Sequence, residues 1–305
     1  MRLLVIGAGS TGGYFGGRLA SAGRDVTFLV RAQRAAQLRA HGLQILSPHG
    51  DFTLAPRILL AADLEEHFDA VLLTVKAFSL QRALEDFAPA VGPGTMILPV
   101  LNGMRHVDVL TARFGRQALI GCICKVATTL DAAGRIVQLA GFQELAYGEM
   151  NGEDSARIRE LDAFMQGAGF HARLSRTIER EMWEKWALLA AMGGMTCLMR
   201  GTIGEIQAAA DGPDFAQRFI DEVVAVISAV GVAPDSGTLA AIKAFLTERG
   251  SNQASSMYRD LQRGQPIELE QIIGDLLARA RQAAIATPLL SAAYTHLSIY
   301  QSRLG

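Results

Sequence analysis

The opening residues of the chain combine a short apolar run with closely spaced glycines. Residues 3–7 are expected to form a buried strand, and the chain continues as Gly-Ala-Gly-Ser-Thr-Gly, with glycine at positions 7, 9 and 12. Residues 10–22 have the pattern of a helix, and residues 25–30 form a second apolar run. A glycine-rich turn between a strand and a helix, followed by another strand, predicts the first βαβ unit of a Rossmann fold.

Each glycine of this turn has a physical task in such a unit. We expect Gly7 to make the tight turn, Gly9 to let a pyrophosphate approach the backbone, and Gly12 to let helix and strand pack closely. Free amide groups at the start of the helix would then face the phosphate charge. A glycine turn that binds nothing is the alternative. The predicted cofactor-binding turn comprises Gly7, Ala8, Gly9, Ser10, Thr11 and Gly12.

The end of the second predicted strand selects between the two nicotinamide dinucleotides. An acidic residue there accepts hydrogen bonds from the ribose hydroxyls of NAD. This chain instead has Val30-Arg31, with Arg34 one helical turn later, and a guanidinium suits the 2′-phosphate of NADP. We therefore expect NADP(H), with Arg31 at the phosphate. An ordinary surface arginine is the alternative.

The secondary-structure pattern divides the chain into two parts. Strands and helices alternate up to about residue 100, and β-prone segments between residues 118 and 148 predict antiparallel strands that close the sheet. Beyond about residue 176 the chain is almost entirely helical, starting with a helix expected over residues 178–191. We expect an α/β Rossmann-type N-terminal domain with a mostly parallel sheet over residues 1–174, and an all-α C-terminal domain over residues 175–305.

Composition bounds the partners of the chain. Its net charge of −1 gives no electrostatic reason to expect nucleic acid or an anionic membrane. It has no apolar run of about 18 residues and no secretory signal pattern, so we expect no membrane span and a cytoplasmic location. Its 3 cysteines and 6 histidines lack ligand spacing, so no metal is expected. The apolar helical part is compatible with a homodimer interface and equally with an ordinary core.

Lysine is rare in this chain, and its positions are therefore informative. Among the 29 basic residues the lysines are Lys76, Lys125, Lys185 and Lys243. Lysine can donate a proton near neutral pH, whereas arginine cannot. Lys76 and Asn102 follow predicted parallel strands, at the edge where a doubly wound sheet places its ligand. Lys185 lies on the first helix of the predicted helical domain.

Taken together, these motifs make the chain similar to the ketopantoate reductase (2-dehydropantoate 2-reductase) family, over nearly its whole length. The resemblance rests on the glycine turn, Arg31, Val-Lys-Ala-Phe at 75–78, Asn-Gly-Met at 102–104, Trp-Glu-Lys at 183–185, Ser-Ser-Met at 255–257 with Asp260, and Ile-Glu-Leu-Glu at 267–270 leading to Gly274. It implies NADPH-dependent reduction of the keto group of a 2-oxo acid, on the route to pantothenate and coenzyme A.

The resemblance also implies a role for each candidate residue. Lys185 would be the general acid that protonates the carbonyl oxygen. Asn102 would hold the substrate or the nicotinamide, and Lys76 would lie by the cofactor. Ser256 would donate to the substrate carboxylate. Glu268 would accept from a substrate hydroxyl or hold Lys185 in place.

The residues alone leave plainer interpretations open for this set. Lys185 has the spacing of an exposed helix charge paired with Glu181. Asn102 and the glycine after it form an ordinary turn dipeptide. Ser256 has the pattern of a solvated helix residue, and Glu268 that of a charge favoured at a helix N-terminus.

Four positions depart from the family pattern. Asparagines usually stand four and eight residues after the lysine, where this chain has Leu189 and Gly193. Gly194 replaces a proline, and Gln253 replaces an asparagine that commonly contacts the substrate. These changes remove hydrogen-bond partners from the substrate site. The alternatives are therefore a paralogous reductase of another 2-oxo or 3-oxo acid, similar to 3-hydroxyacid dehydrogenases, and a non-catalytic NADP(H)-binding sensor.

Overall fold

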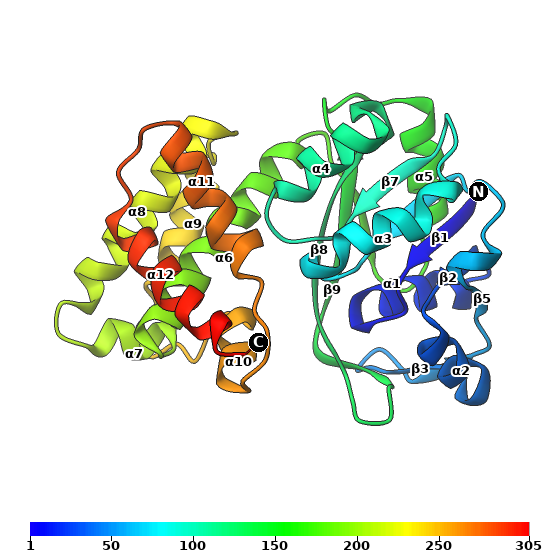
Figure 1. Cartoon of the computed structure of the whole chain (residues 1–305), viewed down its shortest axis with the longest axis horizontal. Coiled ribbons are helices and arrows are strands. Elements are labelled where there is room, and N and C mark those ends of the chain that lie inside the picture. Colours follow the sequence, from blue (N-terminus) through cyan, green and yellow to red (C-terminus); the bar gives the residue numbers. More distant parts are fainter. Residues whose placement is uncertain (305) are drawn as a thin grey trace. The chain divides into compact units, whose positions relative to one another are not determined.

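The structure is a computed structural model that describes residues 1–304, and it divides into two compact units (Figure 1). The N-terminal unit comprises Met1–Leu101 and His106–Ile178. The C-terminal unit comprises Asn102–Arg105 and the chain from Glu179 onwards. The short Asn102–Arg105 segment therefore packs with a part of the chain that is far from it in sequence.

A parallel sheet forms the first half of the N-terminal unit. Its strand order is β5-β2-β1-β6-β7, and every pair in it is parallel. These strands are β1 (Arg2–Ile6), β2 (Asp25–Leu29), β5 (Arg57–Leu59), β6 (Ala70–Leu73) and β7 (Met96–Pro99). Ile6 is paired with Leu73, and Leu73 with Pro99, so the carboxyl ends of β1, β6 and β7 lie side by side. The loops that follow these strands consequently share one edge of the sheet.

Helices connect these strands, and one of them lies between two sheets. They are α1 (Ser10–Ser21), α2 (Ala32–His41), α3 (Leu80–Phe87) and α4 (Arg105–Phe114). Helix α1 contacts β1 and β2 on one side and strands of a second sheet on the other. Its Tyr14 and Phe15 side chains are fully buried, because both of its faces are covered by protein.

The second sheet overturns one expectation from the sequence. Its strands are β3 (Leu43–Leu46), β4 (Phe52–Leu54), β8 (Ile120–Leu130), β9 (Ile136–Glu149) and β10 (His171–Leu174). The antiparallel strands were expected to close the parallel sheet, and this was wrong: β8 and β9 pair with each other as one long hairpin, the green ribbon that runs down this unit in Figure 1. The turn at residues 131–135 lets them satisfy their backbone groups mutually. Among residues 1–304, one isolated bridge, Ile97–Leu119, links the two sheets.

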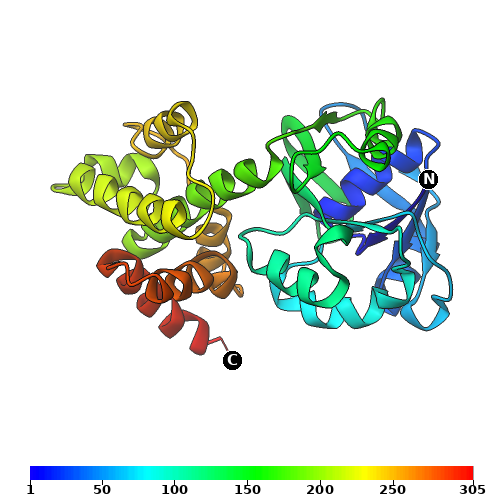
Figure 2. The same ribbon diagram turned by 90° about the horizontal axis from the view of Figure 1, so that it is seen from above.

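The described residues of the C-terminal unit form helices and no strands (Figure 2). They are α6 (Ile178–Met199), α7 (Ile203–Ala208), α8 (Gly212–Val230), α9 (Ser236–Leu246), α10 (Ser256–Gln262), a π-helical turn (Glu270–Gly274) that leads into α11 (Asp275–Gln282), and α12 (Pro288–Ser302). The expected fold class, an α/β Rossmann-type part followed by an all-α part, is confirmed. Helix α6 runs beyond the expected residue 191, because Gly194 does not end it. A Cβ there would clash with the Phe219 ring, so this glycine allows α8 to pack closely.

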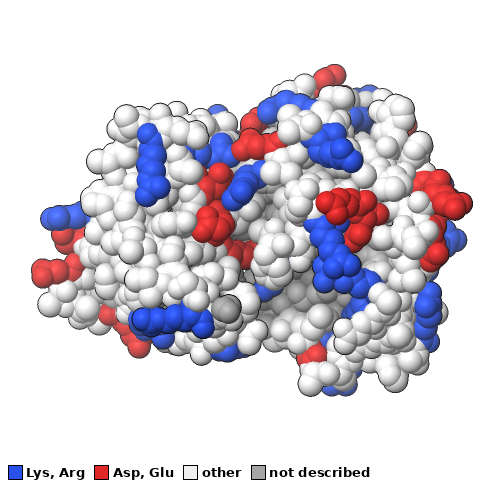
Figure 3. Space-filling view, viewed as in Figure 1, with Lys and Arg blue, Asp and Glu red and all other residues white. Residues whose placement is uncertain are grey.

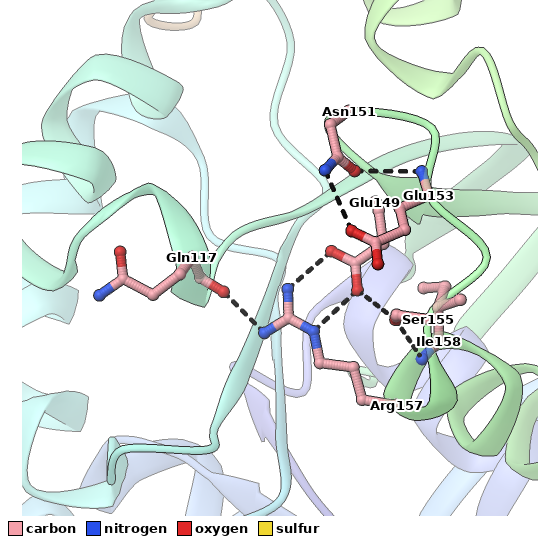
Figure 4. Close-up of polar contacts among 7 residues, drawn as sticks. All are labelled: Gln117, Glu149, Asn151, Glu153, Ser155, Arg157 and Ile158. Carbon is pink, nitrogen blue, oxygen red and sulfur yellow. Dashed lines mark hydrogen bonds and ion pairs between the residues drawn. The ribbon is translucent and has the colours of Figure 1, made fainter.

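An ion pair between a buried glutamate and a half-buried arginine joins the end of β9 to the helix that follows it (Figure 4). Glu149, at the end of β9, is 7% exposed and accepts from Nε and Nη2 of Arg157 at 2.7 and 2.6 Å, and from Oγ of Ser155 at 2.6 Å. Arg157 belongs to α5 (Ala156–Met165) and also donates to the Gln117 carbonyl. Burial acts to raise the pKa of Glu149, but the Arg157 and Ser155 donors outweigh it and hold that pKa below its ordinary value.

We expect Arg157→Met to destabilise the protein by about 1–3 kcal/mol at pH 7, because it leaves the Glu149 carboxylate without its bidentate partner, and the partial exposure of Arg157 keeps the cost below that of a fully buried pair. The folded pKa of Glu149 lies below its unfolded value. Its contribution is therefore complete above about pH 4.3 and is lost as the pH falls through the folded pKa. Urea unfolding at pH 7 and pH 3 should show the difference between variant and parent shrinking at the lower pH.

The matched control is Arg159→Met on the same helix, which removes an exposed pair between Arg159 and Asp154 in the preceding loop. It should cost less than about 1 kcal/mol at either pH. An equal loss of unfolding free energy in the two variants would contradict the stabilising role of the Glu149–Arg157 pair.

Candidate functional site

The glycine turn after β1 has the geometry that its spacing predicts. Gly7 adopts φ +91°, a conformation that residues with a side chain rarely reach, and its N–H donates to Leu29 O at 2.9 Å. A Cβ at Gly12 would clash with Thr74 Oγ1 and with the Gly7 carbonyl. A Cβ at Gly9, in contrast, would have no atom within 4 Å. The turn is thus tightly packed at its two ends and open in the middle.

The start of α1 fits the phosphates of a dinucleotide. The helix begins at Ser10 after Gly9, with no side chain capping it and no acidic residue in its first turn. The first amide groups of a helix have no partner within the helix and carry its positive dipole end. An anion beside the open backbone at Gly9 would satisfy them.

The residues after β6 approach the same turn. Thr74 follows β6 directly and donates from Oγ1 to Ile6 O at 2.9 Å. This hydroxyl joins the ends of β1 and β6, and it is a structural contributor that sequence reasoning missed. Lys76 lies two residues later with its side chain exposed. Thr74 could have been suspected only from its place at the carboxyl end of a central strand.

The two arginines near the end of β2 have different environments. Arg34 is half-buried, donating from Nε to Ala8 O at 3.0 Å and from Nη1 to Gly134 O at 2.9 Å. It thereby connects the glycine turn to the tip of the β8–β9 hairpin, and burial lowers its pKa. The side chain of Arg31, the residue before α2, is exposed and forms no hydrogen bond or ion pair within residues 1–304. Its guanidinium is therefore available to a ligand, whereas that of Arg34 is engaged.

In the C-terminal unit, Asn102 and Glu268 are brought together from distant parts of the sequence. Asn102 Nδ2 donates to Glu268 Oε2 at 3.2 Å, across 166 residues. The next residue, Gly103, has φ +75°, and a Cβ there would clash with the carbonyl of Gln271. The Asn102–Gly103 turn consequently rests on residues 268–271. Both Asn102 and Glu268 are half-buried.

The helix that carries Lys185 is held on the same segment. Trp186 is fully buried, and its Nε1 donates to Ile272 O at 2.9 Å. Ile272 lies in the π-helical turn Glu270–Gly274, a widened turn of a kind often found at functional sites. Lys185, the residue before Trp186, is half-buried. The π-turn therefore supports both the Asn102 turn and the helix that bears the lysine.

The sequence pattern predicts an ordinary helix over residues 269–283, where the structure has this π-helical turn. A buried indole N–H requires an acceptor, and within a helical domain a backbone carbonyl is a natural one. The sequence alone does not specify which carbonyl that is.

The two serines at the start of α10 face different surroundings. Ser255 is buried, where its Oγ accepts from Tyr258 N at 3.0 Å and bonds to Thr196 Oγ1 at 2.9 Å. Ser256, the residue expected at the substrate, is exposed, as is Gln253. Ser255 therefore caps the helix, and Ser256 is the serine that a solute can reach.

On the face drawn in Figure 3, acidic and basic side chains are interspersed rather than gathered by sign. Across residues 1–304, no cluster of three or more His, Cys, Asp or Glu could hold a metal ion. Within the same residues, no helix has both the length and the apolarity to cross a membrane.

A hollow of about 450 Å³ in the N-terminal unit is lined by residues that include Glu149 and Arg157, and none of the candidate site residues lines it.

Two family descriptions match this chain. Residues 3–152 match "Ketopantoate reductase PanE/ApbA", and residues 177–301 match its C-terminal counterpart. Among solved structures, 2-dehydropantoate 2-reductase from Geobacter metallireducens is 29% identical, covers 98% of this chain and 99% of its own, and superposes with a TM-score of 0.86. D-mandelate dehydrogenase with NADH and anilino(oxo)acetate has a TM-score of 0.86 at 21% identity, with 100% and 99% coverage, and so shows a shared fold.

Full-length relatives agree with these matches. A protein of Bacillus subtilis described as the uncharacterized oxidoreductase YkpB is 36% identical over 302 residues, 99% of each chain. A 2-dehydropantoate 2-reductase of Mesorhizobium japonicum is 30% identical and covers 96% of this chain and 95% of its own. The chain therefore belongs to the ketopantoate reductase family of oxidoreductases, which act on a CH–OH or C=O group.

Proposed function

We propose that this protein uses NADPH to reduce the keto group of a 2-oxo acid to a hydroxyl. The observation that carries the proposal is the Asn102–Glu268 hydrogen bond, which unites two candidate substrate-binding residues on the turn that also anchors the Lys185 helix. We further propose that residues 1–174 bind the cofactor and that residues 175–305 supply the proton donor.

The cofactor would be held by the glycine turn, with its pyrophosphate at the start of α1 and its 2′-phosphate at Arg31. The available guanidinium of Arg31 supports NADP over NAD, because it can pair with that phosphate. Lys76, exposed beyond the end of β6, would add positive charge beside the cofactor. A solved protein of this fold is described with NADH, so the fold by itself does not select NADP. The preference for NADP over NAD therefore depends on the residue at position 31. When bound, NADPH supplies a hydride.

Lys185 would provide the proton. As the keto carbon accepts the hydride, negative charge develops on the carbonyl oxygen, and an ammonium both stabilises that charge and protonates it. The products are a 2-hydroxy acid and NADP⁺. Asn102 would orient the substrate or the nicotinamide through its amide. Ser256 would donate to the substrate carboxylate, and Glu268 would keep Asn102 in place.

Ketopantoate, with a role in pantothenate synthesis, is the substrate that the names of several relatives suggest. The 36% identical relative carries the name of an oxidoreductase without a stated substrate, and Leu189 and Gly193 stand where the family has amides. A 2-oxo acid other than ketopantoate is therefore the second candidate.

We expect Lys185→Met to lower kcat/KM for 2-oxo acids by about 10²- to 10⁴-fold, because the carbonyl oxygen loses its proton donor. The Kd for NADPH, measured by fluorescence titration, should remain nearly unchanged. Lys243→Met is the control, because Lys243 pairs with Asp221 on the helical surface. Tight NADPH binding by the parent protein without turnover of any oxo acid would instead support the sensor.

We expect Arg31→Met to weaken NADPH binding by about 10- to 100-fold, the worth of a charge-assisted phosphate contact, and to leave NADH binding unchanged. Arg34→Met is the matched comparison. Because Arg34 braces the Ala8 carbonyl, its loss should weaken the binding of both cofactors alike. Parallel losses for the two cofactors in Arg31→Met would remove Arg31 from the phosphate.

Two glycine variants separate packing from ligand approach. Gly12→Ala should destabilise the fold by about 1–3 kcal/mol in urea, because its methyl group would clash with Thr74 and Gly7. Gly9→Ala has open space for its methyl group, so stability should change little while the Kd for NADPH rises. A Gly9→Ala protein that bound NADPH like the parent would place the pyrophosphate elsewhere.

A further inference from the structure

One face of helix α6 carries the proposed acid and then becomes apolar. Lys185, Leu189 and Gly193 follow one another at intervals of four residues, so they lie in a row along the helix. Lys185 and Leu189 are half-buried, and Gly193 is buried. A group attached to a carbonyl carbon beside the Lys185 ammonium is within reach of the next side chain in this row, Leu189.

The far end of the row is closed by apolar atoms. A Cβ at Gly193 would lie 2.9 Å from Cε of Met257 and 3.9 Å from Cγ2 of Ile272. Met257 and Ile272 are each 3% exposed. The room that a longer side chain at position 193 would need is therefore occupied by a thioether methyl and a branched aliphatic chain.

The hydroxyl of Thr196, three residues after Gly193 on the same helix, already has partners within the protein. Thr196 Oγ1, one turn after Met192, donates to Met192 O at 2.7 Å and bonds to Ser255 Oγ. Glu268 Oε2 accepts from Asn102. A substrate hydroxyl placed along the row would leave water without gaining a hydrogen bond from Leu189 or Met257.

We propose that the protein selects 2-oxo acids whose substituent on the keto carbon is apolar, branched or aromatic and carries no hydroxyl, and that Leu189 and the Met257 side chain over Gly193 determine this preference. The inference rests on the proposed function, because it takes Lys185 as the group that fixes the carbonyl oxygen.

A matched pair of substrates tests the inference. 3,3-Dimethyl-2-oxobutanoate and its 4-hydroxy derivative, ketopantoate, differ by a single hydroxyl. With the parent protein and saturating NADPH, kcat/KM should favour the unhydroxylated acid by about 10- to 100-fold, the discrimination expected when a polar group enters an apolar site unpaired. Phenylglyoxylate, an aromatic 2-oxo acid without a hydroxyl, should also be reduced.

A variant pair assigns the preference to the helix face. Leu189→Asn offers the hydroxyl an amide partner and should lower the preference ratio by about tenfold, whereas Leu189→Met keeps the face apolar and should preserve it. A ratio that moves equally in both variants overturns the role of Leu189.

The ratio of kcat/KM for the two acids, measured with the parent protein, tests the inference even if a variant fails to fold. Equal kcat/KM for the two acids, or a preference for ketopantoate, overturns the inference and leaves the proposed reductase intact. Absence of NADPH oxidation with all three acids contradicts the proposed function itself, and the inference falls with it.

Discussion

The hydrogen bond from the Trp186 indole to the Ile272 carbonyl anchors the helix that carries the candidate proton donor. It fixes α6, and with it Lys185, on the widened turn Glu270–Gly274. The adjacent carbonyl of Gln271 faces Gly103, and Glu268 receives the Asn102 amide. Two segments from different parts of the chain are thus positioned by one irregular turn.

In the N-terminal unit, the glycine turn is closely packed at both ends and open at Gly9. Gly12 allows α1 to contact β6 through Thr74, and Gly7 makes the turn that brings the helix start to the sheet edge. Arg34 then fixes the Ala8 carbonyl from outside. The open space at Gly9 and the uncapped amides of α1 remain for an anion. Because the contacts of Gly7, Gly12 and Arg34 already hold the turn in place, little conformational entropy is lost when a ligand binds.

The sequence predicted the features that depend on local pattern. The strand, turn and helix around the glycines, the all-helical second half and the family were all evident from residue order. The choice of partners between strands was not evident, because β8 and β9 are individually compatible with either sheet. The pairing of β9 with β3 and β10 places the β8–β9 hairpin in the second sheet. Helix α4 was not anticipated, and α6 continued past two glycines that serve the packing of Phe219 and Met257. The contacts of Arg34, Thr74 and Ile272 depend on tertiary neighbours that no local pattern specifies.

The assignment of Asn102–Arg105 to the C-terminal unit limits how this protein can be divided. The chain leaves the N-terminal unit after Leu101, contributes four residues to the helical unit, and returns at His106. A fragment that ended at Ile178 would retain every strand of both sheets but would carry an Asn102 turn deprived of Glu268 and Gln271. The two units are each compact, yet the Asn102–Arg105 loop of one interrupts the sequence of the other. Exchanging the helical unit between relatives would therefore also require exchanging this loop.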